Sequence, residues 1–207
     1  MTRTRIKFCG ITRPADADAA ARLGADAIGL VFAPGSPRFI QLPQAAIIRR
    51  RLPPLVQAVA LFRNAAADEV RRAIAALQPD LLQFHGDETP EYCATFGIPY
   101  WRAVPMKDPT ELSEWERRFA SAAALLLDAH GPSEQGGQGR RFDWSSVRAQ
   151  RPYVLAGGLT PDNVGVAVRA LRPYAVDVST GIESAPGVKD EDRMRQFIEA
   201  VRQADDE

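Results

Sequence analysis

Residues 155–184 read LAGGLTPDNVGVAVRALRPYAVDVSTGIES and place glycines directly after two apolar strands. The strand Tyr153–Leu155 leads into Gly157-Gly158, and the strand Ala175–Val178 leads into Ser179-Thr180-Gly181. Glycines at these points let backbone N–H groups approach an anion closely, and a helix N-terminus nearby favours negative charge. The stretch therefore predicts a phosphate site within about residues 155–184.

Loops of this kind after two successive strands, near the end of a chain of this length, are typical of barrels that bind phosphate after strands seven and eight. The rest of the chain repeats the same alternation of strand and helix. The expected strands are Arg5–Cys9, Asp26–Phe32, Leu55–Phe62, Asp80–Phe84, Pro99–Val104, Ala123–Leu127 and the two above. The expected helices are Pro14–Leu23, Pro43–Arg51, Ala66–Leu77, one from Pro90 to about Phe96, Asp108–Phe119, a short one capped by Asp143, one opening at Thr160-Pro161, and Glu191–Gln203.

Eight strands, each followed by a helix, predict an α/β fold, a single-domain parallel (β/α)8 TIM barrel spanning residues 1–207. The alternative is a doubly wound open sheet. It is weakened because Lys7-Phe8-Cys9-Gly10 stands where such a fold would have Gly-x-Gly-x-x-Gly after the first strand.

Composition narrows the class of partner. Lys and Arg together number 26, as do Asp and Glu, so no net basic field would attract nucleic acid or a membrane surface. No apolar run approaches the roughly 20 residues of a membrane span, and the N-terminus enters a strand without a signal-peptide pattern. Cys9 and Cys93 lie in different kinds of element, which argues against a disulfide framework. We expect a cytoplasmic protein that acts on a small molecule.

Residues at the carboxyl ends of barrel strands face the active-site mouth, and several here are polar. Asp128 follows a buried run of alanines and leucines, where desolvation can raise the pKa of a carboxyl group. The alternative is a loop-anchoring role. His85, on the same strand face as Gln83, either binds substrate or holds loops. Arg38 follows strand two and is expected across the mouth from the phosphate loops; a solvated loop arginine is its alternative.

Period-two alternation puts Lys7 on the same strand face as Cys9, and Asp177 on the same face as Ser179. Because strands one and eight are neighbours in a closed barrel, Lys7 and Asp177 are expected to pair inside it. The pair alone is compatible with a purely structural role. A cation below Cys9 would nevertheless favour its thiolate. Cys9 itself is either core packing or a site residue, whereas Cys93 is expected to pack inside a helix.

Other chemistries have little support. No His, Cys and carboxylate set has the spacing of a metal site, and no Gly-x-Ser-x-Gly elbow is present. The Gly/Gln-rich loop Ser133–Arg140 is too polar to pack and is a candidate lid.

Taken in order, these motifs resemble the phosphoribosylanthranilate isomerase family of tryptophan biosynthesis over nearly the whole chain. The matching motifs are Lys7–Thr12, Phe32–Ile40 with Ser36-Pro-Arg38, Gln83–Gly86, Leu127-Asp128, Gly136–Gly139 with Phe142–Trp144, Gly157–Leu159 with Asn163, and Asp177–Glu183 with Pro186-Gly187 and Lys189-Asp190. Ala156 departs from the usual Ser before the glycines and affects at most one phosphate contact.

The resemblance implies a cofactor-free barrel, with no metal, that isomerises a phosphoribosyl amine to a ketose phosphate by an Amadori rearrangement. By this resemblance Asp128 is the general acid and Cys9 the general base. Arg38 would bind the anthranilate carboxylate, while His85 and Asp177 line the substrate site. Backbone N–H groups of Gly158, Gly181 and Ile182 would hold the phosphate. The protein would act as a monomer or a homodimer.

Three alternatives compete with this interpretation. The related isomerase of histidine biosynthesis is expected to have Asp in place of Cys9. A non-catalytic phosphosugar-binding barrel would make the thiol and Asp128 incidental. Indole-glycerol-phosphate synthase would be expected to show a catalytic Lys near the end of strand two or three, and neither strand offers one.

Overall fold

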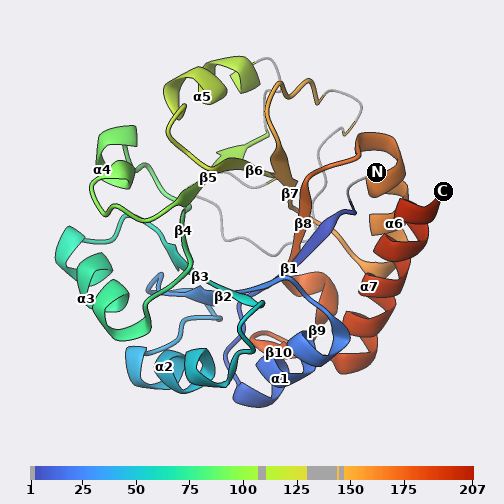
Figure 1. The fold of residues 1–207 in the computed structure, drawn as a ribbon, viewed down its shortest axis with the longest axis horizontal. Coiled ribbons are helices and arrows are strands. Elements are labelled where there is room, and N and C mark those ends of the chain that lie inside the picture. Colours follow the sequence, from blue (N-terminus) through green and yellow to red (C-terminus); the bar gives the residue numbers. More distant parts are fainter. Residues whose placement is uncertain (1–2, 107–110, 130–143, 145–146) are drawn as a thin grey trace.

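The computed structural model describes residues 3–106, 111–129, 144 and 147–207. Within these residues, strands β1 to β8 are parallel, pair in chain order and close into a barrel that the helices surround (Figure 1). The barrel strands are β1 Arg5–Cys9, β2 Ala27–Val31, β3 Gln57–Phe62, β4 Leu81–Phe84, β5 Tyr100–Pro105, β6 Ala124–Asp128, β7 Tyr153–Leu155 and β8 Ala175–Val178. The helices are α1 Pro14–Leu23, α2 Leu42–Arg51, α3 Ala67–Leu77, α4 Pro90–Ala94, α5 Leu112–Arg118, α6 Pro161–Leu171 and α7 Glu191–Asp206. The predicted (β/α)8 barrel is confirmed.

The barrel closes between its first and last strands. β1 pairs with β8 in a register that sets Lys7 opposite Asp177, and with β2 on its other side. Near the chain ends, Asp205 of α7 accepts hydrogen bonds from the backbone N and the Oγ1 of Thr4. The two ends of the chain are therefore joined beside the closing pair of strands.

Alternation along the strands separates two hydrophobic layers. One cluster fills the barrel with side chains from successive strands, among them Ala27, Val59, Leu81, Trp101, Leu126 and Val154. A larger cluster packs the outer faces of the strands against the helices and includes Phe8, Ile28, Phe84, Val168 and Phe197. Fully burying one such side chain stabilises the fold by about 1.5–3 kcal/mol. The packed interior leaves the strand ends as the place for a site.

Element boundaries mostly agree with the sequence-based expectations. Strand β3 begins at Gln57 rather than Leu55, whose side chain is 93% exposed in the preceding loop. Helix α7 continues to Asp206, three residues beyond the expected Gln203. The expected helix at Asp143 and the candidate lid Ser133–Arg140 lie outside the described residues.

The connection after β8 differs from a simple strand–helix step. A 3-10 turn, η3 Thr180–Ile182, is followed by two short antiparallel strands, β9 Glu183–Ala185 and β10 Val188–Lys189. Gly187, at φ +78°, allows the turn between them. This hairpin, which the sequence did not predict, leads to α7, whose N-cap Asp190 accepts a hydrogen bond from the backbone N of Arg193.

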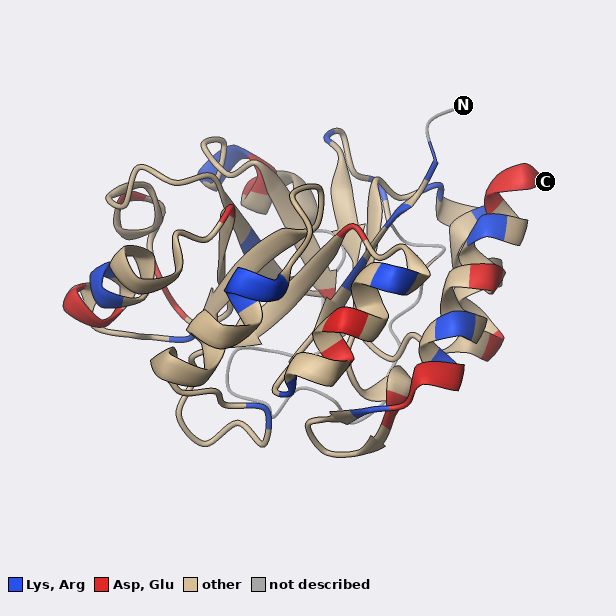
Figure 2. Ribbon diagram, turned by 60° about the horizontal axis from the view of Figure 1, so that its bottom comes forward, with Lys and Arg blue, Asp and Glu red and all other residues tan. Residues whose placement is uncertain are grey.

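Charged residues of both signs are spread over the outer elements, and α7 carries both along its length (Figure 2). Net charge over the whole sequence is zero. No helix within the described ranges combines the length and apolar content needed to cross a membrane.

Candidate active site

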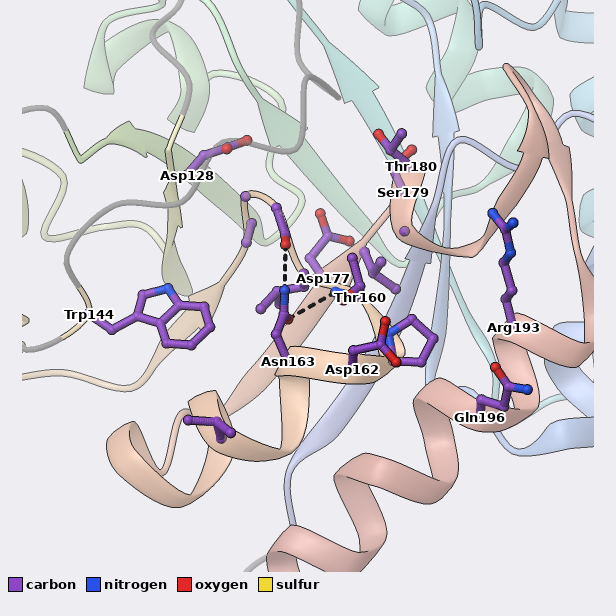
Figure 3. Close-up of a pocket in the computed structure, with 18 residues that line it drawn as sticks. Asp128, Trp144, Thr160, Asp162, Asn163, Asp177, Ser179, Thr180, Arg193 and Gln196 are labelled. Carbon is purple, nitrogen blue, oxygen red and sulfur yellow. Dashed lines mark hydrogen bonds between the residues drawn. The ribbon is translucent and has the colours of Figure 1, made fainter.

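A cavity of about 760 Å³ opens at the carboxyl ends of β6, β7 and β8 (Figure 3). Four of the site residues expected from the sequence line it: Asp128, Asp177, Gly158 and Gly181. In the view of Figure 3, Asp128 and Arg193 lie on opposite sides, with Asp177 between them. Further lining residues are Trp144, Thr160, Asp162, Asn163, Ser179, Thr180 and Gln196. The cavity brings a carboxyl group and the two glycine loops together.

The glycine loops after β7 and β8 touch. Gly157 and Gly158 have φ of +83° and +65°, a region that other residues rarely adopt. A Cβ atom on Gly181 would overlap the carbonyl oxygen of Leu159, so only glycine allows the second loop to lie this close to the first. The two loops within residues 155–184 therefore lie side by side and line the same cavity.

Asn163 braces the first loop from inside α6. Its Oδ1 accepts a hydrogen bond from the backbone N of Thr160 at 3.0 Å, and its Nδ2 donates to the carbonyl oxygen of Gly158 at 2.9 Å. Thr160 is the N-cap residue, as expected, but its own side chain makes no capping hydrogen bond. The amide of Asn163 therefore fixes the conformation of the loop.

Asp128 ends β6 and is 8% exposed. A Cβ on Gly157 would stand 2.9 Å from Asp128 Oδ1, so the glycine gives the carboxyl group its space. His85 Nε2 lies 3.4 Å from Asp128 Oδ2. Gln83 Nε2 lies 3.3 Å from His85 Nδ1, so the imidazole stands between this amide and the carboxyl group of Asp128.

His85 belongs to a loop held by a buried ion pair. Glu88 accepts hydrogen bonds from the backbone N of Asn64 at 2.7 Å, from the backbone N of Gly86 at 2.8 Å and from Arg102 Nη1 at 2.8 Å. Arg102 also donates to the carbonyl oxygen of Gly86 at 2.5 Å. Burial lowers the pKa of Arg102, and Glu88 opposes that change. The network ties the loops after β3 and β4 to β5 and so places His85.

Cys9 ends β1 and is buried above the predicted ion pair. Lys7 Nζ lies 2.7 Å from Asp177 Oδ1, which confirms the expected pairing. Burial raises the pKa of Cys9 above its ordinary value; Lys7 and Lys189 act to lower it, while Asp177 raises it. Burial also acts to lower the pKa of Lys7, but Asp177 and Cys9 outweigh it and raise that pKa. Lys7 does favour the thiolate, as expected, yet burial outweighs it in the unliganded protein.

The expected position of Arg38, across the mouth from the phosphate loops, is wrong. Its Nε and Nη2 donate to the two carboxylate oxygens of Glu183 at 2.8 and 2.7 Å, and Nη2 also lies 3.3 Å from Thr180 Oγ1. The reason is topological, because β1 alone separates β2 from β8 in the closed barrel. Arg38 therefore lies on the same side as the loop after β8.

Sequence reasoning missed three charged residues around this loop. Glu183 and Lys189 are buried, and Lys189 Nζ lies 2.8 Å from Glu183 Oε1 and 3.1 Å from the carbonyl oxygen of Ser179. Arg193 is the only cation that lines the cavity among the described residues, and it donates to the carbonyl oxygen of Glu183. Its only sequence signal was its place in the first turn of the helix that follows the phosphate loop.

The remaining expected residues lie outside the cavity lining. The side chain of Ile182 is fully buried, so only its backbone could face a ligand. Arg38 and His85 each lie beside a lining residue, Thr180 and Asp128 respectively, and Cys9 interacts electrostatically with the lining residue Asp177. Among the described residues, no group of three or more His, Cys, Asp or Glu side chains could hold a metal ion.

Comparisons with known proteins agree with this geometry. The family model described as N-(5'phosphoribosyl)anthranilate (PRA) isomerase matches residues 6–200. The N-(5'-phosphoribosyl)anthranilate isomerase of Leptothrix cholodnii is 54% identical over 98% of this chain and 93% of its own length.

Two solved structures have the same fold. Phosphoribosyl anthranilate isomerase from Thermus thermophilus superposes with a TM-score of 0.87 at 37% identity, covering 97% of this chain and 99% of its own. Another phosphoribosyl anthranilate isomerase, solved with reduced 1-(o-carboxyphenylamino)-1-deoxyribulose 5-phosphate, superposes with a TM-score of 0.84 at 33% identity over the same shares. The chain therefore belongs to the N-(5'-phosphoribosyl)anthranilate isomerase family.

Proposed function

We propose that this chain converts N-(5-phospho-β-D-ribosyl)anthranilate to 1-(2-carboxyphenylamino)-1-deoxy-D-ribulose 5-phosphate in tryptophan biosynthesis. The reaction is an aldose–ketose isomerisation, an Amadori rearrangement. The observation that carries the proposal, beside family membership, is the cavity that joins the carboxyl group of Asp128 to the two glycine loops. A phosphosugar isomerase of the histidine-biosynthesis type and a non-catalytic barrel are less favoured, because the family model matches nearly the whole chain.

Asp128 acts as the general acid in the first step. Its carboxyl proton goes to the ribose ring oxygen as the bond from C1 to that oxygen breaks, and the electron pair of the bond stays on oxygen. The anthranilate nitrogen forms a double bond to C1, giving an iminium ion. A positioned acid contributes about 10²–10⁴-fold to such a step. Burial at the end of β6 and the neighbouring His85 hold the group in place.

Cys9 acts as the general base in the second step. Its thiolate removes the proton from C2, and the electrons of that C–H bond form the double bond between C1 and C2 while the iminium electrons return to nitrogen. The resulting enolamine gains a proton at C1 and loses its hydroxyl proton at C2 to give the ketose. Lys7, paired with Asp177 beneath Cys9, stabilises the thiolate.

The two ends of the substrate are bound by different groups. Backbone N–H groups of Gly158, Gly181 and Ile182 hold the phosphate, and Arg193 adds a cation to this part of the cavity. Arg38 binds the anthranilate carboxylate with the guanidinium edge that Glu183 leaves open, since Nη1 has no partner among the described residues.

The reaction needs only proton transfers, so we propose that it uses no cofactor and no metal. The partner is the phosphorylated small molecule, and a chain with zero net charge favours neither nucleic acid nor a membrane surface. We propose a monomer or a homodimer that works in the cytoplasm, where the free thiols of Cys9 and Cys93 stay reduced.

The test follows the loss of phosphoribosylanthranilate fluorescence on incubation with the protein. Asp128→Asn should lower kcat by about 10²–10⁴-fold, or roughly 3–5 kcal/mol of barrier, with little change in KM. Asp68→Asn, a surface carboxyl paired with Arg71, serves as the control and should match the parent. No fluorescence loss with the parent protein would overturn the proposal. An Asp128→Asn variant that keeps most of its kcat would remove Asp128 from the mechanism.

A further inference from the structure

The thiol of Cys9 lies in a buried cluster of charges that comes from four parts of the barrel. Lys7 is on β1 and Asp177 on β8; Arg38 follows β2, and Glu183 and Lys189 form the hairpin β9–β10. Each of these five residues is at most 9% exposed. Three are cations and two are carboxylates, so the cluster carries one excess positive charge when all five are ionised. A buried charge needs a compensating partner.

Lys189 is held where its charge acts on Cys9. Its Nζ donates to the carbonyl oxygen of Ser179, which directly follows the strand paired with β1, and its side chain is fully buried. Electrostatic interactions couple Cys9 to Lys7, Lys189, Arg38 and Asp177. Burial lowers the pKa of Lys189 while Glu183 and Cys9 raise it. In the protein without substrate, the thiolate of Cys9 would neutralise this excess charge.

We propose that Lys189 is a positioning residue for Cys9, supplying from the hairpin the positive charge that stabilises the thiolate. It does not touch the substrate in this scheme, and its effect passes through Cys9. The inference rests on the proposed role of Cys9 as the base. Lys189 differs from Lys7 in how its charge is balanced. Asp177 pairs with Lys7, whereas Glu183 is shared between Lys189 and Arg38, so two cations face one carboxylate.

The test titrates Cys9 in the protein without substrate, by the ultraviolet absorbance of the thiolate. The same titration of a Cys9→Ser variant in each background is subtracted to remove the tyrosines. Burial raises the pKa of Cys93, the other thiol, to about 12, so Cys93 does not ionise in the range measured. Lys189→Met should raise the Cys9 midpoint by about one pH unit or more, and Lys189→Arg should leave it near the parent value.

A second variant separates charge from structure. Lys189→Met/Glu183→Gln removes a cation and a carboxylate together, so the excess charge returns and the midpoint should move back towards the parent value. If the hairpin only supports the fold, the double variant will be no closer to the parent than Lys189→Met. That result, or an unchanged midpoint in Lys189→Met, would overturn the inference.

Folding and function are checked separately. Far-ultraviolet circular dichroism shows whether each variant folds, and Lys189→Gln, which keeps an N–H donor for Glu183, replaces Lys189→Met if that variant does not. In a plot of kcat/KM against pH, the midpoint of the acidic limb should move to higher pH together with the midpoint of the Cys9 titration. If the midpoint shifts but Cys9→Ser remains active, the assignment of Cys9 as base fails while the electrostatic role of Lys189 stands.

Discussion

Gly29, in the middle of β2, makes room for both Cys9 and Lys7. A Cβ atom at this position would stand 2.9 Å from Cys9 Sγ and 3.1 Å from Lys7 Nζ, closer than such contacts normally come. Gly29→Ala should therefore displace the thiol and the ammonium group and lower kcat at least tenfold, since misplaced catalytic groups cost rate steeply. The measurement is kcat alongside urea unfolding.

Gly97→Ala is the control for Gly29→Ala, because Gly97 has φ +66° and no atom near an added Cβ. It should cost about 1 kcal/mol of stability with unchanged kcat. Equal kcat in both variants would show that the space beside Cys9 is not needed.

At the scale of residues, the sequence predicted contacts that strand periodicity imposes and missed those that long connections impose. The Lys7–Asp177 pair follows from alternation on two strands that must be neighbours in a closed barrel. Arg38 was misplaced because its partner Glu183 lies 145 residues further along the chain, in an element that the sequence did not predict. Local pattern carries no information about which loop a long side chain will meet.

At the scale of elements, the barrel strands and the seven α-helices that the structure describes were predicted to within a few residues, whereas the β9–β10 hairpin was not. Strands of three and two residues are too short to show period-two alternation. Their geometry depends on Gly187 and on Glu183, whose Oε1 accepts from the backbone N of Gly187. The sequence could not predict these interactions, because they depend on where the fold places the charged side chains of the site.

Helix α4 packs against the barrel through Cys93. Because this thiol is buried, the free energy of unfolding should fall as the pH becomes alkaline. Burial raises the pKa of Cys93 to about 12 in the folded chain, whereas an exposed thiol titrates near about 8.5. Between these two pKa values the unfolded chain binds fewer protons than the folded chain. The stability that the protonated Cys93 contributes is therefore fully present below about pH 8.5 and is lost as the pH rises towards 12. The unfolding free energy should fall more steeply over this range in the parent than in Cys93→Ala.

The comparison uses urea unfolding at several pH values from about 8 to 11. Cys93→Ala loses packing at every pH, so the slope rather than the offset is decisive. Tyr153, whose pKa burial also raises to about 12, is present in both proteins and cancels in the difference. Parallel curves would mean that Cys93 is not protected from ionisation in the folded protein.

At the scale of the whole molecule, the closed barrel was predictable because one strand–helix repeat runs along the chain without a change in composition. Its cavity was predictable only in part. The glycine loops can be recognised in the sequence. Arg193 cannot, because it lies in the first turn of a helix whose pattern is that of a surface helix. Its position in the cavity depends on how η3 and the hairpin orient the start of α7. Closure brings the two chain ends together, and a contact between them contributes to the stability of the entire fold.

That contact is made by Asp205, which accepts hydrogen bonds from the backbone N of Thr4 at 2.7 Å and from its Oγ1 at 2.6 Å. Hydrogen bonds to a charged group contribute about 1.5–3 kcal/mol, and Asp205→Ala would also leave a buried N–H without a partner. We expect a loss of about 2–4 kcal/mol, or a fall of several degrees in Tm at roughly 2–4 °C per kcal/mol for a chain of this size. Asp206→Ala, an exposed neighbour that makes no hydrogen bond with Thr4, should unfold with the parent. If both variants had the same Tm, the chain ends would add nothing to barrel closure, and stability would rest on the pairing of β1 with β8 alone.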